Sequence, residues 1–311
     1  MPGRVMFARP IKPARMTADP IAEAVPMFAS PSAKAATIPR VLAFVVLSST
    51  TAFAPSLIRP DTAFAQAPPD MVRITGGAFT MGRDGGNADE RPAHGVTLGP
   101  FLIDRVPVTN AAFAAFLNAM GGPINAGGRN LFDWDDDDAR VHRAEWHYRA
   151  DEGFENHPAV EASWRGARDY CRWRGKRLPT EAEWERAARG TEARPYPWGD
   201  QPPDNSRARY GSGWGRTVAV GSLPRGATPE GVMNMAGNVH EWVSSLYKPY
   251  PYRAKDGREH PYVAGERVTR GGAADTDAET LGTTWRGANV SRNPLSGHHN
   301  IGFRCAQSVG R

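Results

Sequence analysis

The stretch "SWRGARDYCRWRGKRLPTEAEWERAARG", residues 163–190, predicts two helices with a short connection between them. Ser163 is a typical N-cap, and apolar residues then recur at helical spacing until the next glycine. After "KRLP", Thr180 and Glu183 have the Thr-x-x-Glu spacing of a capping box, and Gly190 ends the second helix. These two helices are the clearest elements in the sequence.

The rest of the chain beyond its first 65 residues shows short elements without a linker or an internal repeat. Thr109 fits an N-cap, and apolar residues recur at helical spacing over 113–120 before a Gly-Gly-Pro stop. Two short strands flank an earlier Gly-Gly turn, and the later sequence is broken by Gly, Pro and Asn. We therefore predict one domain, residues 66–311, with little regular secondary structure and with most of its nine tryptophans in the core.

Residues 1–65 have the layout of a secretory signal peptide and its leader. The apolar run "VLAFVVLSSTTAFA" at 41–54 follows Lys34 and Arg40, and "AFA" at 63–65 fits a small-x-small cleavage site. The run is shorter than the roughly 20 apolar residues that a membrane span needs. We therefore predict an exported protein, periplasmic or secreted, that has no membrane span after the leader is cleaved.

The charge balance argues against a nucleic-acid partner. The chain has 38 basic and 33 acidic residues, a formal net charge of +5. Seven of the basic and three of the acidic residues lie in the predicted leader, which leaves 31 against 30. A mature domain this close to neutral has no excess of basic side chains with which to hold a phosphate backbone.

The sequence contains two cysteines, Cys171 and Cys305, 134 positions apart. In an oxidising compartment an isolated pair most simply forms one disulfide. Two buried free thiols are the alternative, and the residues alone leave both open.

Seven segments of the predicted domain together resemble the formylglycine-generating enzyme family, also called sulfatase-modifying factors. They are "GGAFTMG" (76–82), "PVTNAAFAAF" (107–116), "HPAVEASWRGARDYCRWRGKRLPTEAEWERAARG" (157–190), "YPWGD" (196–200), "GVMNMAGNVHEWV" (231–243), "RGGA" (270–273) and "NIGFRCA" (300–306). They follow the family's order and span nearly all of the predicted domain, so the set is specific although each segment alone is not. The resemblance implies an α+β, C-type-lectin-like fold and a disulfide between Cys171 and Cys305.

The resemblance also implies structural calcium. One family site is matched by Asn234, Gly237, Val239 and Glu241. Gly237 and Val239 would ligate through their carbonyls, and oxygen ligands of these kinds suit Ca²⁺. The alternative is an asparagine-capped turn in which Glu241 pairs with an arginine.

A second family calcium site is matched less well. Asn205 and Ser206 stand at its first two positions, and Trp214 matches an aromatic residue that ligates through its carbonyl. Ser212 occurs where the family has an aspartate. Since this removes the only carboxylate, we expect weak calcium binding there.

The family's catalytic cysteines are missing. Formylglycine-generating enzymes bind copper(I) through two cysteines that lie five residues apart between "GG" and "GFRC", and thiolates are the natural ligands of this soft ion. Counted without gaps, those positions are Thr276 and Leu281 in "GGAADTDAETLGTTWR", residues 271–286. Neither side chain can replace a thiolate, so copper is not expected and the copper-thiolate reaction cannot run in its usual form.

Three functions of different classes fit this pattern. The first is a maturation factor or divergent oxidase that acts on an exported protein or metabolite, as in family members of siderophore (pyoverdine) maturation. The second is a non-catalytic, lectin-like binding or accessory module. The third is formylglycine generation on a sulfatase cysteine, which the missing thiols disfavour.

Other residues near the lost cysteines could carry chemistry. Asp275, Asp277 and Glu279 would serve as acid–base groups if buried, although alternating loop positions are more often solvated. Trp285 and Arg286 fit either a ligand-facing rim of a cleft or a stacked pair that supports the loop.

Two further groups are polar enough to bind a metal. The acidic run "DWDDDD" at 133–138 could hold a cation, but a solvated loop is the more frequent outcome for such a run. His298 and His299 are adjacent, and adjacent imidazoles usually diverge, so a metal shared between them is not predicted.

Overall fold

The computed structural model describes residues 70–287 and 292–309. The predicted signal peptide and its cleavage site lie outside these ranges. Within them the chain forms three α-helices and four small sheets, joined by long irregular segments. The predicted α+β fold with little regular secondary structure is confirmed. No helix of the described ranges is long and apolar enough to cross a bilayer.

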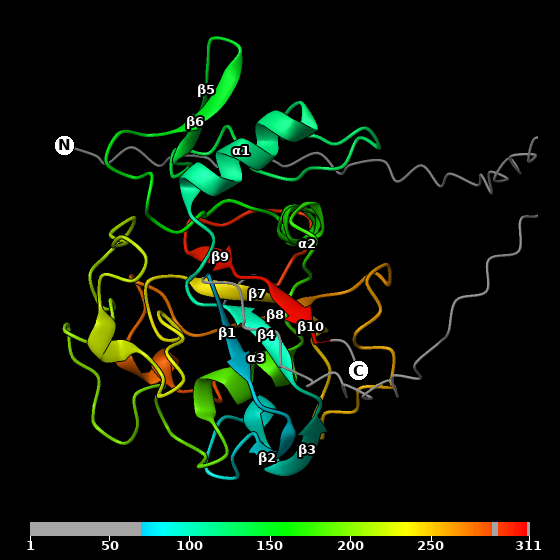
Figure 1. Cartoon of the computed structure of the whole chain (residues 1–311), viewed down its shortest axis with the longest axis vertical. Helices are drawn as coiled ribbons and strands as arrows, with labels where there is room; N and C mark the ends of the chain where they lie inside the picture. Colours follow the sequence, from blue (N-terminus) through cyan, green and yellow to red (C-terminus); the bar gives the residue numbers. More distant parts are fainter. Residues whose placement is uncertain (1–69, 288–291, 310–311) are drawn as a thin grey trace, which may run out of the picture. The chain divides into compact units, whose positions relative to one another are not determined.

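The sheets combine strands that are far apart in the sequence (Figure 1). One antiparallel sheet has the order β1 (Met71–Ile74), β4 (Phe101–Asp104), β10 (Ala306–Ser308). A second has the order β8 (Arg267–Arg270), β7 (His240–Leu246), β9 (Ile301–Phe303), in which β7 is antiparallel to β8 and parallel to β9. Two antiparallel pairs complete the set, β2 (Gly77–Met81) with β3 (His94–Leu98) and β5 (Val141–Ala144) with β6 (His147–Ala150). The start of the "GFRC" segment (302–305) thereby lies beside β7.

The predicted helix boundaries are confirmed by side-chain caps. The helices are α1 (Asn110–Met120), α2 (Trp164–Trp173) and α3 (Glu181–Arg189). Thr109 and Ser163 accept hydrogen bonds from backbone N–H groups three residues on, at 3.3 and 3.0 Å, and Thr180 and Glu183 form the predicted capping box. Gly166 lets α2 approach the preceding loop, because a Cβ there would lie 1.9 Å from a backbone carbonyl oxygen.

The two strands predicted around the Gly-Gly turn exist, but they belong to different sheets. β1 pairs with β4, whereas β2 pairs with β3. A Cβ on Gly76, between them, would lie 2.8 Å from the Leu98 carbonyl oxygen, so a side chain would not fit there.

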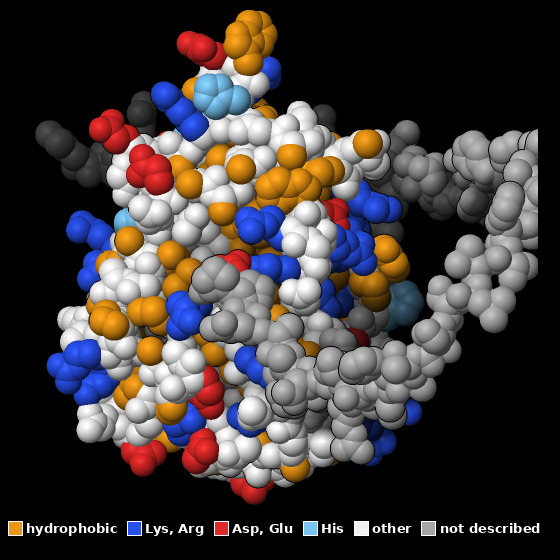
Figure 2. Space-filling view, viewed as in Figure 1, with side chains coloured by type: hydrophobic (Ala, Val, Ile, Leu, Met, Phe, Trp, Pro, Cys, Tyr) orange, Lys and Arg blue, Asp and Glu red, His pale blue; other side chains and the backbone are white. Residues whose placement is uncertain are grey.

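The prediction that most tryptophans fill the core is wrong. Four are buried, Trp164, Trp184, Trp242 and Trp285, Trp198 is half-buried, and four are exposed, Trp134, Trp146, Trp173 and Trp214. The exposed ones lie in loops, at a hairpin turn and at a helix end. Trp146 is 89% exposed at the turn of the β5–β6 hairpin, and Figure 2 shows a hydrophobic side chain at the tip of this projection.

Candidate functional site

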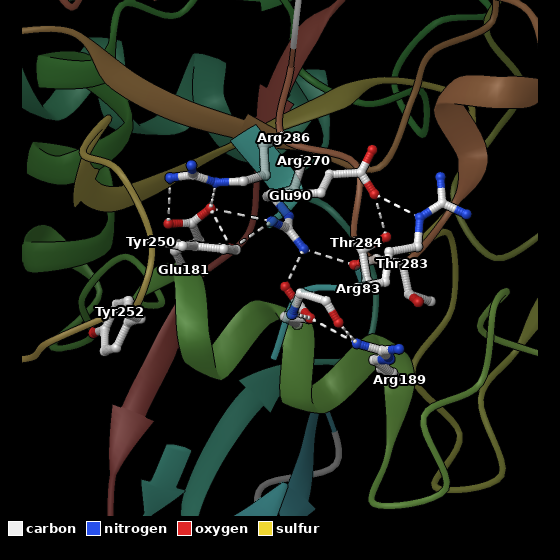
Figure 3. Close-up of polar contacts among 12 residues, drawn as sticks. Arg83, Glu90, Glu181, Arg189, Tyr250, Tyr252, Arg270, Thr283, Thr284 and Arg286 are labelled. Carbon is white, nitrogen blue, oxygen red and sulfur yellow. Dashed lines mark hydrogen bonds and ion pairs between the residues drawn. The ribbon is translucent and has the colours of Figure 1, made fainter. Parts of the chain in front are cut away.

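A loop of residues 271–287 follows β8 and contains both positions that match the family's copper cysteines. Its two ends are fixed to α3 by buried ion pairs (Figure 3). Arg270 lies 2.7 Å from Glu185 and 3.1 Å from Glu181, and Arg286 Nε lies 2.6 Å from Glu181 Oε1. All four side chains are at most 1% exposed. The 271–287 loop is therefore anchored to one helix at its start and at its end.

These ion pairs shift the pKa values of the groups that form them. Burial alone would raise the pKa of Glu181, but Arg286 and Arg270 outweigh burial and hold the pKa below its usual range. Burial alone would lower the pKa of Arg286, and the charge of Glu181 raises it instead. Of the two roles that the sequence leaves open for Arg286, its buried position therefore favours support of the loop.

A third buried carboxylate braces the same loop (Figure 3). Thr284 Oγ1 donates to Glu90 Oε2 at 2.5 Å, and Arg83 Nε donates to the same oxygen at 2.8 Å. The backbone carbonyl of Thr283 accepts from Arg270 Nη2 at 2.6 Å. The end of the loop is thus fixed through side chains and backbone together.

Thr276 and Leu281 are used for turn and core contacts. Thr276 Oγ1 accepts from the backbone N–H of Ala273 at 2.9 Å and lies 2.7 Å from the hydroxyl of Thr280. Leu281 is fully buried and packs in a small apolar cluster with Ala208 and Ala236. At both positions the side chain stabilises the loop through ordinary packing and hydrogen bonds.

Cys171 on α2 and Cys305 after β9 form a disulfide, and both are fully buried. The predicted pairing is confirmed. Since these are the only two cysteines of the chain, no thiolate is left to bind copper(I).

Asp275 and His299 form a hydrogen-bonded pair next to Thr276. His299 Nε2 lies 2.9 Å from Asp275 Oδ2, Asn300 Nδ2 donates to the same carboxylate at 3.3 Å, and Trp214 stacks on the His299 ring. Burial would raise the pKa of Asp275, but the bonds from His299 and Asn300 outweigh it and lower the pKa. An imidazole oriented by an ionised carboxylate is suited to proton transfer.

The other two acidic residues of the loop, Asp277 and Glu279, are exposed. They have the solvated position that is usual for alternating loop carboxylates. Of the three acid–base candidates, Asp275 is thus the one that the fold partly buries and pairs with a histidine.

His240, the first residue of β7, is a fully buried histidine whose charge environment includes Asp275 and His299. Neither of its ring nitrogens has a hydrogen-bond partner within the described ranges. Its ring stacks on Trp285 with a centroid distance of 5.1 Å, and Trp285 is 6% exposed. Burial lowers the pKa of His240 to about 3, so the imidazole is neutral. Trp285 therefore contacts His240 in the interior, which favours the loop-supporting role over the rim of a cleft.

Comparison with known proteins decides the family. The family model for the sulfatase-modifying factor enzyme 1-like domain matches residues 57–309. The chain belongs to the sulfatase-modifying factor family. A formylglycine-generating enzyme of Streptomyces coelicolor is 38% identical over 281 residues, which cover 77% of this chain and 89% of that protein.

Two further relatives have different names. A Bos taurus protein named "Inactive C-alpha-formylglycine-generating enzyme 2" is 33% identical and covers 78% of this chain and 89% of its own. The structure of PvdO from Pseudomonas aeruginosa matches with a TM-score of 0.60 and 28% identity, over 77% of this chain and 94% of that chain.

At the first predicted calcium site, an arginine side chain is bonded to the carboxylate of Glu241. Glu241 accepts from Arg304 Nε and Nη2, both at 2.7 Å, and from Trp184 Nε1 at 2.9 Å. Arg304 Nη2 also donates to the carbonyl of Asn234 at 3.2 Å. The residues in this arrangement do not fit calcium, because the guanidinium group of Arg304 already bonds both oxygens of the Glu241 carboxylate. Calcium at Asn234, Gly237, Val239 and Glu241 stays a prediction that requires Arg304 to move.

The residues of the second predicted calcium site lie at the surface. Asn205 and Ser206 are exposed, and Ser206 donates to Asp204 through its backbone N–H at 2.8 Å and through its hydroxyl at 2.5 Å. Trp214 is 62% exposed. Ser212 donates its hydroxyl to a backbone carbonyl at 2.8 Å, so it offers no charge to a cation. Weak calcium binding here likewise stays a prediction.

Sequence reasoning missed the pairing of Asp275 with His299. The two residues are 24 positions apart, and their contact depends on how β9 returns alongside β7. Both residues are recognisable in the sequence as polar candidates, but their spacing does not indicate that they meet. The buried arginines Arg270 and Arg286 were missed as core residues because charged side chains are usually exposed.

Proposed function

We propose that this member of the sulfatase-modifying factor family is an exported maturation factor or divergent oxidase that acts on a periplasmic protein or metabolite without the copper-thiolate mechanism. The proposal is carried by the 271–287 loop, where counting between the family motifs puts Thr276 and Leu281 at the positions of the two thiols. The disulfide between Cys171 and Cys305 supports it, because no other cysteine is available. The loop is nevertheless rigidly anchored, as expected for a scaffold that presents chemical groups.

Asp275 and His299 are the residues to which we assign proton transfer. Asp275 engages Nε2 of the imidazole, so Nδ1 is the nitrogen that can take a proton from a substrate or return it. Trp214 stacks on this imidazole and is largely exposed, which offers an aromatic surface to a substrate beside the proton-transfer group.

His240 adds a neutral polar group to the same region. A buried imidazole without a partner costs free energy, so a bound water or a polar substrate group that reached it would be stabilised. We assign His240 a hydrogen-bonding role, because burial keeps it neutral.

The alternative function is a non-catalytic, lectin-like binding or accessory module. The exposed Trp214 favours it, since an aromatic face can hold a partner without any reaction. The Bos taurus relative, whose name describes it as inactive, also favours it. Formylglycine generation on a sulfatase cysteine ranks third, because it needs thiolates that this chain lacks.

The test is deletion of the gene in the organism that encodes it, followed by complementation. Four versions are compared: wild type, Asp275→Asn, His299→Gln and, as a matched control in the same loop, Asp277→Asn. The masses of exported proteins and metabolites are then measured by mass spectrometry. We expect a product to be lost on deletion, restored by wild type and by Asp277→Asn, and not restored by the two site variants.

Two outcomes would contradict parts of this proposal. Full restoration by Asp275→Asn and His299→Gln would remove the assigned proton-transfer role. A change in the amount of an exported protein, with no species altered in mass, would favour the binding module instead.

A further inference from the structure

A cavity of about 250 Å³ lies beside α2, on residues that the candidate functional site does not use. It is lined by Arg168 and Arg172 of α2, by Ser244 of β7 and by residues on either side of them in space. No residue of the 271–287 loop lines it, and neither does His299. The cavity is therefore separate from the site to which we assign proton transfer.

The segment 259–263, which contributes to the cavity wall, is held in place by buried arginines. Arg168 Nη1 donates to the Pro261 carbonyl at 3.2 Å. Arg267 Nη2, on β8, donates to the Val263 carbonyl at 2.8 Å. Both arginine side chains are at least nine-tenths buried, so the wall is fixed by the protein itself and the cavity is preformed, as is usual for small-molecule sites.

Apolar side chains form a continuous part of the cavity lining. They are Trp164, Leu178 and Pro261. Trp164 and Leu178 are 3% and 2% exposed and belong to the largest apolar cluster of the core, which fixes their positions. A ligand with an apolar body would remove this surface from water, which is favourable.

Two of the three arginines that line the cavity are paired with carboxylates. Arg168 Nη2 lies 2.7 Å from Asp169 Oδ1, and both terminal nitrogens of Arg177 donate to Glu183 at 2.6 Å. Arg172 also lines the cavity, but within the described ranges it forms no ion pair, and its Nη1 donates to a tyrosine hydroxyl at 3.3 Å. The charge of Arg172 is therefore not compensated by a carboxylate.

Glu259, the carboxylate that lines the cavity, is offset by a different arginine. It accepts from Ser244 Oγ at 2.6 Å and from the Tyr252 hydroxyl at 2.8 Å. Arg267 is 1% exposed, and burial lowers its pKa to about 10, a shift that the charge of Glu259 opposes. Since Glu259 and Arg267 offset each other, Arg172 remains as one excess positive charge at the cavity.

We propose that this cavity binds a small aromatic monocarboxylate. Arg172 supplies a positive charge and a planar fork of donors, which match the two oxygens of a carboxylate. Trp164, Leu178 and Pro261 contact the aromatic body. One uncompensated cation balances one negative charge, so a dianion such as phosphate would keep a charge without a partner and would gain nothing from the apolar lining.

The test titrates the full chain with phenylacetate to about 10 mM, which nearly saturates a site with a Kd near 1 mM. The readout is the ¹⁵N–¹H signal of the Trp164 indole, which lines the cavity and donates to the Val243 carbonyl at 2.7 Å. Trp146, 89% exposed at the β5–β6 turn, is the internal control. Trp164→Phe and Trp146→Phe assign the two signals. We expect the Trp164 signal to shift with saturation and the Trp146 signal to stay in place.

A matched pair of variants tests the role of Arg172. Arg172→Gln should weaken phenylacetate binding by roughly tenfold or more, because a charge-assisted hydrogen bond is lost. Arg172 is exposed, so the substitution leaves the core intact. Arg174→Gln is the control, since Arg174 is an exposed arginine two positions later that does not line the cavity. It should bind phenylacetate as wild type does.

Two analogues separate the charge from the aromatic body. Phenylacetamide has the same shape without the charge, and acetate has the charge without the ring. Each should bind wild type at least roughly tenfold more weakly than phenylacetate does.

Four results would overturn the proposal. The first is an absence of any shift of the Trp164 signal with phenylacetate. The second is equal affinity of wild type and Arg172→Gln for phenylacetate. The third is binding of phenylacetamide as tight as that of phenylacetate, which would remove the assignment to an anion. The fourth is binding of acetate as tight as that of phenylacetate, which would remove the assignment to an aromatic body.

Discussion

Leu281 stands where catalytic relatives have a metal-binding thiol, and its side chain fills an apolar cluster beneath the 271–287 loop. Thr276, at the other such position, bonds the turn that begins the loop. Both side chains therefore stabilise the loop through contacts with the protein itself. The contribution of each can be measured as the change in the free energy of unfolding on substitution.

The first prediction is that Leu281→Ala lowers the free energy of unfolding by about 2–5 kcal/mol, because it leaves a cavity in a closed cluster. Leu295→Ala is the control, since Leu295 is 48% exposed and a surface change of this kind costs about 0.5 kcal/mol or less. Urea unfolding measures both. An equal cost for the two variants would show that Leu281 does not support the loop.

At the level of secondary structure elements, the 271–287 loop and α3 act as one unit because Arg270 and Arg286 both pair with Glu181.

The second prediction is that Glu181→Gln lowers the free energy of unfolding by about 3–5 kcal/mol, because it leaves two buried guanidinium groups without their full counter-charge. Asp151→Asn breaks a half-buried, solvent-accessible pair with Arg140, at 3.9 Å, and should cost about 0–1 kcal/mol. Guanidinium chloride unfolding distinguishes them, and a cost below 1 kcal/mol for Glu181→Gln would contradict the anchoring role.

The third prediction concerns His157, whose backbone carbonyl accepts from Asn110 N at the start of α1. Burial, and then the charge of Arg140, lower the pKa of His157 in the folded protein below its unfolded value of about 6.5. The unfolded state therefore binds more protons, so this contribution is present above pH ~6.5 and is lost as pH falls below it. His157→Gln should reduce the drop in Tm between about pH 7 and pH 5. His147→Gln, at an exposed position of β6 for which the described residues show no ion pair, is the control and should leave the drop unchanged. Identical pH profiles for wild type and His157→Gln would contradict the prediction.

The sequence was sufficient for elements whose signals are local. The caps at Thr109, Ser163 and Thr180 depend on bonds to groups only three residues away, so they could be recognised without the fold. Arg270 and Arg286 could not be placed in the core, because what stabilises them there is Glu181 on α3, far away in the sequence. The Asp275–His299 pair has the same cause, since it depends on the return of the segment after residue 296.

At the scale of the whole molecule, the disulfide joins α2 to the segment between β9 and β10, across 134 positions. The fourth prediction is that Cys171→Ala/Cys305→Ala lowers the free energy of unfolding by about 2–5 kcal/mol, chiefly because the unfolded chain becomes less constrained. Guanidinium chloride unfolding of the variant is compared with that of wild type with and without reductant. A variant as stable as oxidised wild type would contradict this account of the disulfide.

The chain keeps the family scaffold and an anchored loop but has no free thiol, because both of its cysteines are bonded to each other. We propose that it does not convert a sulfatase cysteine to formylglycine with copper. A thiolate for copper(I) would have to come from one of these two cysteines.

The most direct test incubates the purified protein with copper(I), dioxygen and a cysteine-containing sulfatase peptide, with the Streptomyces coelicolor formylglycine-generating enzyme as positive control. The product is detected by mass spectrometry, and oxygen consumption is recorded in parallel. The account predicts no formylglycine and no oxygen consumption that depends on the peptide. Turnover of the peptide by this chain would contradict it.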